Sequence, residues 1–156
     1  DRGAWAALRR AAEQRRKPAR VLPIFGSDLV GEWVRRSRMN LDAAGLADCV
    51  RLDRADVLDR TPPADAGVMV ANPPYGVRIG EAEDLLAFYP RLGDALKQRW
   101  GGWRCYLFSA DPELPKRIGL KATRRTPLFN GALECRLFEY RMVAGSNRER
   151  AARAPE

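Results

Sequence analysis

The chain has 156 residues, 46% of them hydrophobic, which is enough for one domain with a sizeable core. Its 28 Lys and Arg against 20 Asp and Glu give a net charge of +8, which favours a polyanionic partner such as a nucleic acid. The absence of histidine excludes Ser-His-Asp and Cys-His catalysis and His-ligated metal centres within the chain.

The cysteines and the hydropathy pattern indicate the compartment. Cys49, Cys105 and Cys135 are odd in number and far apart, with no CxxC spacing. This argues against a disulfide framework or a zinc site and fits a reducing cytoplasm. No apolar run approaches the length of a transmembrane helix, and the first residues lack the apolar stretch of a signal peptide. We therefore expect a cytoplasmic protein with no membrane contact and no bound metal.

Helices and strands alternate along most of the chain. Apolar residues at helical spacing predict three amphipathic helices, over 4–17, 29–44 and 81–99. Short apolar runs predict four strands, over 21–25, 50–52, 67–71 and 103–108. Among the aromatic residues, Trp33 and Trp103 are expected in the core. The buried stripes of the second and third helices are expected to include Val30 and Tyr89. This alternation predicts an α/β, Rossmann-like fold with a parallel, doubly wound sheet.

The end of the chain follows a different pattern. Two β-rich runs, 120–129 and 133–142, flank Asn130-Gly131, which is a strong hairpin signal. A Rossmann-like sheet that ends in an antiparallel hairpin is the class I methyltransferase arrangement. Residues 144–156 are small, polar and charged, so we expect one domain over 1–143 followed by a charged flexible tail.

The most informative motif is Asn72-Pro73-Pro74-Tyr75, which directly follows the apolar run 67–71. A rigid Pro-Pro turn there places Asn72 and Tyr75 at the carboxyl end of a strand, where open α/β sheets bind ligands. The Asn72 side-chain oxygen and the Pro73 carbonyl can accept hydrogen bonds from both N–H groups of a conjugated amine. These bonds restore electron density to its nitrogen. Tyr75 offers a flat face for an extruded base. The alternative is an ordinary strand followed by a tight turn, because Asn and Pro both favour turns.

Two carboxylates follow earlier strands. Asp28, with Ser27 before it, ends the first strand region, and Asp56, with Val57 after it, follows the second. In Rossmann-like sites an acidic residue at this position accepts hydrogen bonds from ribose hydroxyls, and a second one could accept from an adenine amino group. The alternatives are that Asp28 caps the following helix and that Asp56 is a solvated loop residue. Because Asn72 follows the next strand, three successive strand ends carry polar groups, which favours the binding role.

The glycine-rich turn that receives the methionine part of S-adenosylmethionine in such folds is not found. The chain opens on a helix, and no GxGxxG or GxG follows an early strand. We therefore expect the fold to lack its first strand and glycine loop, and the chain to be part of a longer protein. The isolated chain is expected to be inactive and to bind the cofactor weakly or not at all.

The sequence resembles the THUMP-associated rRNA methyltransferases, a family that includes 23S rRNA guanine-N2 methyltransferases. The match runs in register from about Trp5 to Met142. It rests on these segments: Asn72-Pro-Pro-Tyr-Gly-Val-Arg-Ile-Gly80, Leu92-Gly-Asp-Ala-Leu-Lys97, Gly101-Gly-Trp103, Phe108-Ser109 and Asn130-Gly-Ala-Leu-Glu-Cys135.

This resemblance implies S-adenosylmethionine as the methyl donor and the exocyclic N2 of a guanosine in 23S rRNA as the acceptor. It also implies that Asp28, with Ser27, binds the ribose and that Asp56, with Val57, contacts the adenine. The catalytic motif would be Asn72, Pro73, Pro74 and Tyr75. The family's N-terminal part, with its RNA-binding THUMP domain, is absent from this sequence.

Two other functions stay open. The same tetrapeptide serves DNA adenine-N6 and protein glutamine methyltransferases, because all three present a conjugated amino group. A non-catalytic basic RNA-binding module is the second alternative, and the missing glycine loop favours it.

The missing strand also has an architectural consequence. In the resembled fold it lies between the strand that ends at Asp28 and the strand that ends at Asn72. Unpaired N–H and C=O groups on a buried edge are costly, and exposed edges invite pairing with another chain. We therefore expect the two strands either to close directly on each other or to take a strand from a partner, as in a strand-sharing dimer.

Overall fold

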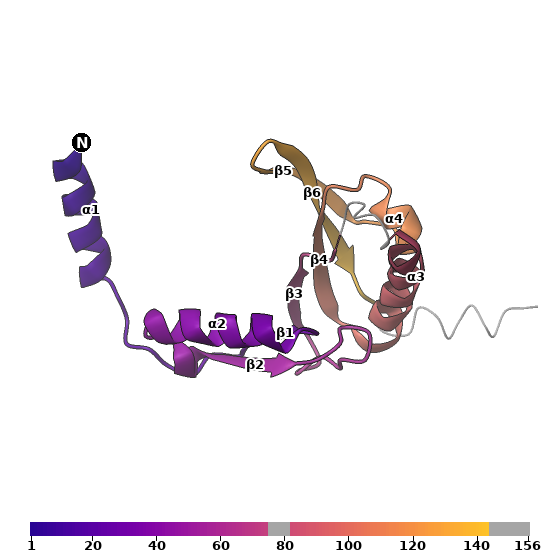
Figure 1. Ribbon diagram of the computed structural model, residues 1–156, viewed down its shortest axis with the longest axis horizontal. Coiled ribbons are helices and arrows are strands. Elements are labelled where there is room, and N and C mark those ends of the chain that lie inside the picture. The colour runs from indigo at the N-terminus through magenta and orange to yellow at the C-terminus, as the bar shows by residue number, and fades with distance from the viewer. Residues whose placement is uncertain (75–81, 144–156) are drawn as a thin grey trace, which may run out of the picture. The chain divides into compact units, whose positions relative to one another are not determined.

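A computed structural model describes residues 1–74 and 82–143, without the side chains of residues 82–85. The chain divides into two compact units, Asp1–Asp56 and Val57–Glu156 (Figure 1). Whether residues 1–143 act as one domain stays a prediction, and the expected tail 144–156 lies outside the described residues.

Unit 1 is built on two parallel strands. It contains α1 (Arg2–Gln14), β1 (Ile24–Asp28), α2 (Gly31–Ala43), the short 3-10 helix η1 (Ala47–Cys49) and β2 (Val50–Arg54). β1 pairs with β2, with Ile24 opposite Val50 and Asp28 opposite Arg54, and α2 lies alongside the pair (Figure 1).

The core of unit 1 is small. Of its residues only Val34 and Cys49 are buried. Trp33 was expected in the core, but 51% of its surface is exposed, so that expectation is wrong. The physical reason is that Trp33 lies on the solvent side of α2, where the guanidinium of Arg36 stacks 4.9 Å from the ring centroid.

Unit 2 contains a four-stranded mixed sheet. Its elements are β3 (Gly67–Ala71), α3 (Ala82–Arg99), β4 (Trp103–Ser109), α4 (Leu114–Arg117), β5 (Arg124–Asn130) and β6 (Leu133–Arg141). The strand order is β3-β4-β6-β5, with β3 parallel to β4 and with β6 antiparallel to both β4 and β5. In Figure 1, α3 and α4 lie on the same side of this sheet.

The main hydrophobic core lies between this sheet and its two helices. Every second residue of β4 from Trp103 to Ser109 is buried, as expected for a strand with one face on a core. α3 adds the buried side chains of Tyr89, Leu92 and Leu96. At Gly93 the helix approaches so closely that a Cβ would collide with the carbonyl oxygen of Ile118. Trp103 is buried as expected, and its indole Nε1 donates to the Ala64 carbonyl at 2.8 Å.

The element order confirms the α/β fold with a closing antiparallel hairpin. The first strand lies three residues later than expected, because Gly26 to Asp28 continue the ladder with β2. α2 begins at Gly31 rather than at residue 29, because a carboxylate oxygen of Asp28 accepts the Val30 N–H at 2.7 Å and closes a turn first.

Direct closure between the strand that ends at Asp28 and the strand before Asn72 stays a prediction, because β1 and β3 belong to different units. Within residues 1–74 and 82–143, β1 has β2 as its one ladder partner and β3 has β4. Ile24 and Phe25 of β1 and Val68 and Val70 of β3 are exposed. A strand donated by another chain stays a prediction. No helix in the described part of the chain is long and apolar enough to cross a membrane.

Candidate active site

The motif after β3 lies at the carboxyl edge of the sheet in unit 2. Asn72 is exposed directly after the strand, Pro73 is buried, and Pro74 is exposed. Tyr75 lies outside the described residues. The carbonyl of Pro74 accepts a hydrogen bond from the hydroxyl of Tyr89 on α3. The turn is therefore fixed at its far end, and Asn72 faces solvent where a substrate could reach it.

Tyr89 contacts the motif through this hydrogen bond, although the sequence pattern assigned it only to the buried stripe of the third helix. Its side chain is 2% exposed. Burial, followed by the negative charge of Asp111, raises the pKa of the phenol, and Arg117 opposes this shift. The hydroxyl therefore stays protonated at neutral pH and keeps its role as donor. The signal in the sequence was a Tyr among the Leu residues of the buried stripe of α3.

The loop after β4 is ordered beside this tyrosine. Asp111 forms an ion pair with Arg117 at 2.9 Å, and its N–H donates to the hydroxyl oxygen of Ser109 at 3.1 Å. Because the charge of Asp111 shifts the pKa of Tyr89, this loop lies close to the residue that holds Pro74. Ser109 is 1% exposed and is one of two buried polar or charged residues in the described core.

In unit 1 the carboxylates predicted to bind the cofactor end adjacent parallel strands. Asp28, preceded by Ser27 in β1, is exposed, and its backbone carbonyl accepts the Ala55 N–H at 3.1 Å. Asp56 follows directly and is partly buried, whereas Val57 begins unit 2 and packs against its core. The structure thus brings Asp28 and Asp56 to the same edge of one strand pair.

The carboxylates at this edge are hydrogen-bond acceptors, as a ligand that carries hydroxyl groups requires. One oxygen of Asp28 holds the Val30 N–H, which orients the carboxylate and leaves acceptor positions for ribose hydroxyls. The alternative role of Asp28 was to cap the following helix. Asp28 is not the N-cap of α2, because Val30 occupies that position. Within the described residues no group of three or more His, Cys, Asp and Glu could hold a metal ion.

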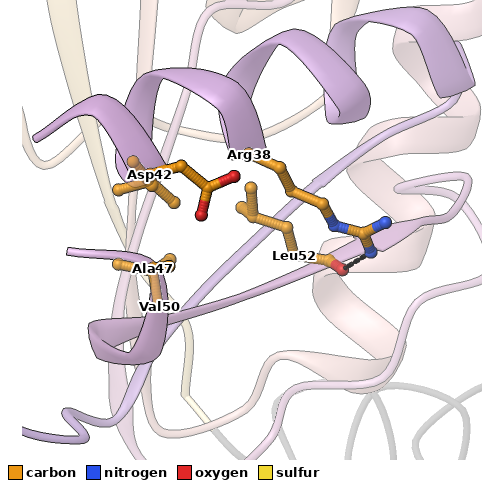
Figure 2. A pocket seen from close by; sticks show the side chains of 6 residues that line it. Arg38, Asp42, Ala47, Val50 and Leu52 are labelled. Atoms are coloured by element: carbon orange, nitrogen blue, oxygen red, sulfur yellow. Dashed lines mark hydrogen bonds between the residues drawn. The ribbon is translucent and has the colours of Figure 1, made fainter. Parts of the chain in front are cut away.

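Two shallow hollows lie on the described part of the chain. One, of about 170 Å³, lies in unit 1. Figure 2 shows its lining, where the Arg38 guanidinium donates to the carbonyl of Leu52 at 2.7 Å across from Asp42. It contains none of the predicted site residues. The other, of about 220 Å³, lies in unit 2 beside the loop after β4, and Ala110, Pro112, Glu134 and Arg136 line it.

The fold and the motif define a methyltransferase of the α/β class, and comparison with known proteins agrees. Residues 1–139 match the family model described as RMKL-like, methyltransferase domain. The chain is 40% identical over 146 residues to the ribosomal RNA large subunit methyltransferase K/L of Allochromatium vinosum, covering 91% of this chain and 20% of that protein.

Solved structures give the same result. The crystal structure of SMU.472 complexed with SAH superposes with a TM-score of 0.78 at 26% identity, covering 91% of this chain and 37% of that one. A predicted N6-adenine-specific DNA methylase from Listeria monocytogenes superposes with a TM-score of 0.73 at 27% identity. The match covers 91% of this chain and 36% of that one.

The chain belongs to the RMKL-like methyltransferase domain family. This confirms the resemblance to the rRNA methyltransferases drawn from the motifs after β3 and in the hairpin. The chain spans between 18 and 37% of the length of the curated relatives compared with it.

Proposed function

We propose that this chain carries the catalytic motif of an S-adenosylmethionine-dependent methyltransferase whose acceptor is the exocyclic N2 of a guanosine in 23S rRNA. The observation that carries the proposal is the exposed Asn72 at the end of β3, followed by a Pro-Pro turn that Tyr89 holds by the Pro74 carbonyl. The family match and the name of the Allochromatium vinosum relative support it.

The chemical problem in this reaction is a weak nucleophile. The N2 lone pair of guanine is delocalised into the ring, so the amine attacks a methyl group poorly. The side-chain oxygen of Asn72 and the carbonyl of Pro73 accept hydrogen bonds from the two N–H groups of this amine. They raise the electron density on nitrogen as the new N–C bond forms. Tyr75 supports the base by stacking. The nitrogen loses one proton to solvent, and the donor would leave as a neutral thioether that keeps the electron pair of the broken bond between sulfur and the methyl carbon.

The methyl donor is S-adenosylmethionine, which supplies an electrophilic methyl group on a positively charged sulfur. On this chain Asp28, with Ser27, would accept hydrogen bonds from the ribose hydroxyls, and Asp56, with Val57, would contact the adenine. The structure of SMU.472 with SAH supports this choice of cofactor, as does the family to which the chain belongs.

A second acceptor is favoured by one observation. The Listeria monocytogenes protein is named as a DNA adenine-N6 methylase, and an adenine amino group poses the same chemical problem. The basic composition suits either nucleic acid.

The test uses the complete protein encoded by the gene, with unmodified 23S rRNA transcript and unmethylated DNA as separate substrates. Digestion to nucleosides and mass spectrometry identify the product. We expect N2-methylguanosine from RNA and no methylated base from DNA. N6-methyladenine from DNA, with unmodified RNA, would reverse the assignment.

A further inference from the structure

A surface next to the motif has a composition that the proposed chemistry does not require. The tip of the β5–β6 hairpin exposes large apolar side chains. Phe129, 71% exposed, lies on one face, and Leu133 and Leu128, 49% and 40% exposed, lie on the other. β5 is antiparallel to β6, which is antiparallel to β4, so the tip projects from the sheet edge at which β3 and β4 end. That is the edge that carries Asn72.

The register places four residues on one face near this tip, among them an aromatic, an acidic and a basic side chain. Phe129 lies directly opposite Glu134, and Pro127 directly opposite Arg136, so all four share a face. Glu134 and Arg136 also line the hollow of about 220 Å³, with Ala110 and Pro112. This volume is below the roughly 300–1,000 Å³ of enclosed ligand pockets, as expected for an open site that receives one flat ring.

Glu134 and Arg136 form an ion pair in this hollow that uses only part of their hydrogen-bonding capacity. Arg136 donates through one Nη to a Glu134 oxygen at 3.0 Å, and Glu134 is 59% exposed. A guanidinium has five N–H donors and a carboxylate has about four acceptor positions, so both keep capacity for a ligand. Arg125 adds positive charge on the same face. The hydrogen bond from Lys116 is the main cause of the lowered pKa of Glu113, and Arg125 adds to it. Burial raises the pKa of Tyr140, and Arg125 offsets part of that shift.

The hollow is also near the motif. Ala110 and Pro112 flank Asp111, whose charge acts on Tyr89, and Tyr89 holds the Pro74 carbonyl. β6 is two strands from β3 in the sheet, which is on the order of 10 Å. A short stretch of single-stranded nucleic acid spans such a separation.

We propose that Phe129, Glu134 and Arg136 form a subsite for a guanine that neighbours the target nucleotide in single-stranded RNA. This inference rests on the proposed function and adds a determinant of its specificity. Phe129 gives a face on which the base stacks, as in other single-strand sites. The Glu134 carboxylate accepts from the guanine N1–H and N2 amine, and Arg136 donates to O6 or to the adjacent phosphate. Adenine has an acceptor at N1, which the carboxylate repels.

Binding of model RNAs to the complete protein tests the subsite. The probes are oligouridines of about 12 nucleotides with a single G, A or C at the centre, followed by fluorescence anisotropy at fixed salt. We expect the G probe to bind most tightly. Phe129→Ala should weaken its binding by about 5- to 150-fold, the range for a lost stack. Arg136→Ala should weaken all probes, and Glu134→Gln should abolish the preference for G over A.

Matched controls lie on the other face of the same sheet. Leu128→Ala removes an exposed apolar side chain from the same hairpin, and Arg104→Ala removes an exposed arginine from β4. Both should bind the G probe as the unmodified protein does. Thermal unfolding followed by circular dichroism checks that every variant is folded.

Methyl transfer to 23S rRNA transcript, measured in parallel, separates this inference from the proposed function. We expect Phe129→Ala and Arg136→Ala to raise KM with little change in kcat. Suppose that the protein methylates RNA, and that both variants have the same RNA affinity and turnover as the Leu128→Ala control. The subsite is then refuted, and the proposed function stands. If the protein does not methylate RNA, the proposed function fails, and the binding preference still decides the subsite. Equal binding of the G and A probes would overturn it.

Discussion

Replacing Tyr89 by Phe tests whether the hydroxyl that holds the Pro74 carbonyl positions the turn that we propose to be catalytic. The substitution removes one oxygen and keeps the ring, which is 2% exposed and packs edge-on against Phe88. The core should therefore be retained. A hydrogen bond of this kind contributes about 0.5–1.5 kcal/mol net, and water can replace part of it because Pro74 is exposed.

If that free energy is fully expressed in the position of Asn72 and Pro73, kcat falls about 2- to 10-fold. KM for S-adenosylmethionine should not change, since Tyr89 is a positioning residue and lies away from Asp28 in the chain. The assay is methyl transfer by the complete protein to 23S rRNA transcript at saturating cofactor. Thermal unfolding of the same samples reports stability separately.

Tyr106→Phe is the matched control. Tyr106 is partly buried in β4 and lies on the opposite face of the sheet from the core, so it loses the same hydroxyl without touching the motif. Equal kcat in the two variants, with a lower melting temperature for Tyr89→Phe, would show that the bond serves stability and would refute the positioning role.

Three further predictions concern the cofactor, the core and pH. Asp28→Ala in the complete protein should weaken S-adenosylmethionine binding by about 1.5–3 kcal/mol in calorimetric titration. If the affinity is unchanged, as expected for the exposed control Asp48→Ala, the role of Asp28 is only to stabilise the turn before α2. Gly93→Ala should destabilise by about 1–3 kcal/mol in urea unfolding, because the new Cβ meets the Ile118 carbonyl, although Ala is the better helix former. The exposed Gln98→Ala on the same helix should change little, and equal stability of the two would contradict the close packing. Burial raises the pKa of the Cys105 thiol from 9.0 to about 12, so its contribution to stability is present below pH 9 and is lost as the pH rises toward 12. Cys105→Ala should reduce this alkaline loss, and identical pH profiles would exclude the thiol as its cause.

The sequence predicted unit 2 well because its signals are local and mutually consistent. The alternation in β4, the apolar stripe of α3 and the Asn130-Gly131 turn each specify one element. The same residues bury one another, so local patterns and tertiary packing agree. Tyr89 was placed correctly in the core, but its hydrogen bond to Pro74 depends on a contact 15 residues away that no periodicity reveals.

Unit 1 was predicted less well because its packing is sparse. The expected buried face of α2 retains only Val34, whereas Trp33 and Val30 are exposed. A helical stripe shows which residues could be buried and gives no information on whether anything covers them. The boundary of β1 was missed for a related reason, since Gly26 and Ser27 read as a turn until the ladder with β2 extends the strand through Asp28.

The most direct test of the account is Asn72→Ala in the complete protein, with methyl transfer and cofactor affinity measured on the same preparation. We predict that the affinity for S-adenosylmethionine is unchanged and that turnover on 23S rRNA falls about 10²- to 10³-fold, because the lost oxygen acts on the substrate amine. The product of the unmodified enzyme should be N2-methylguanosine. Full turnover by Asn72→Ala would contradict the assignment of the motif, and with it the proposed chemistry.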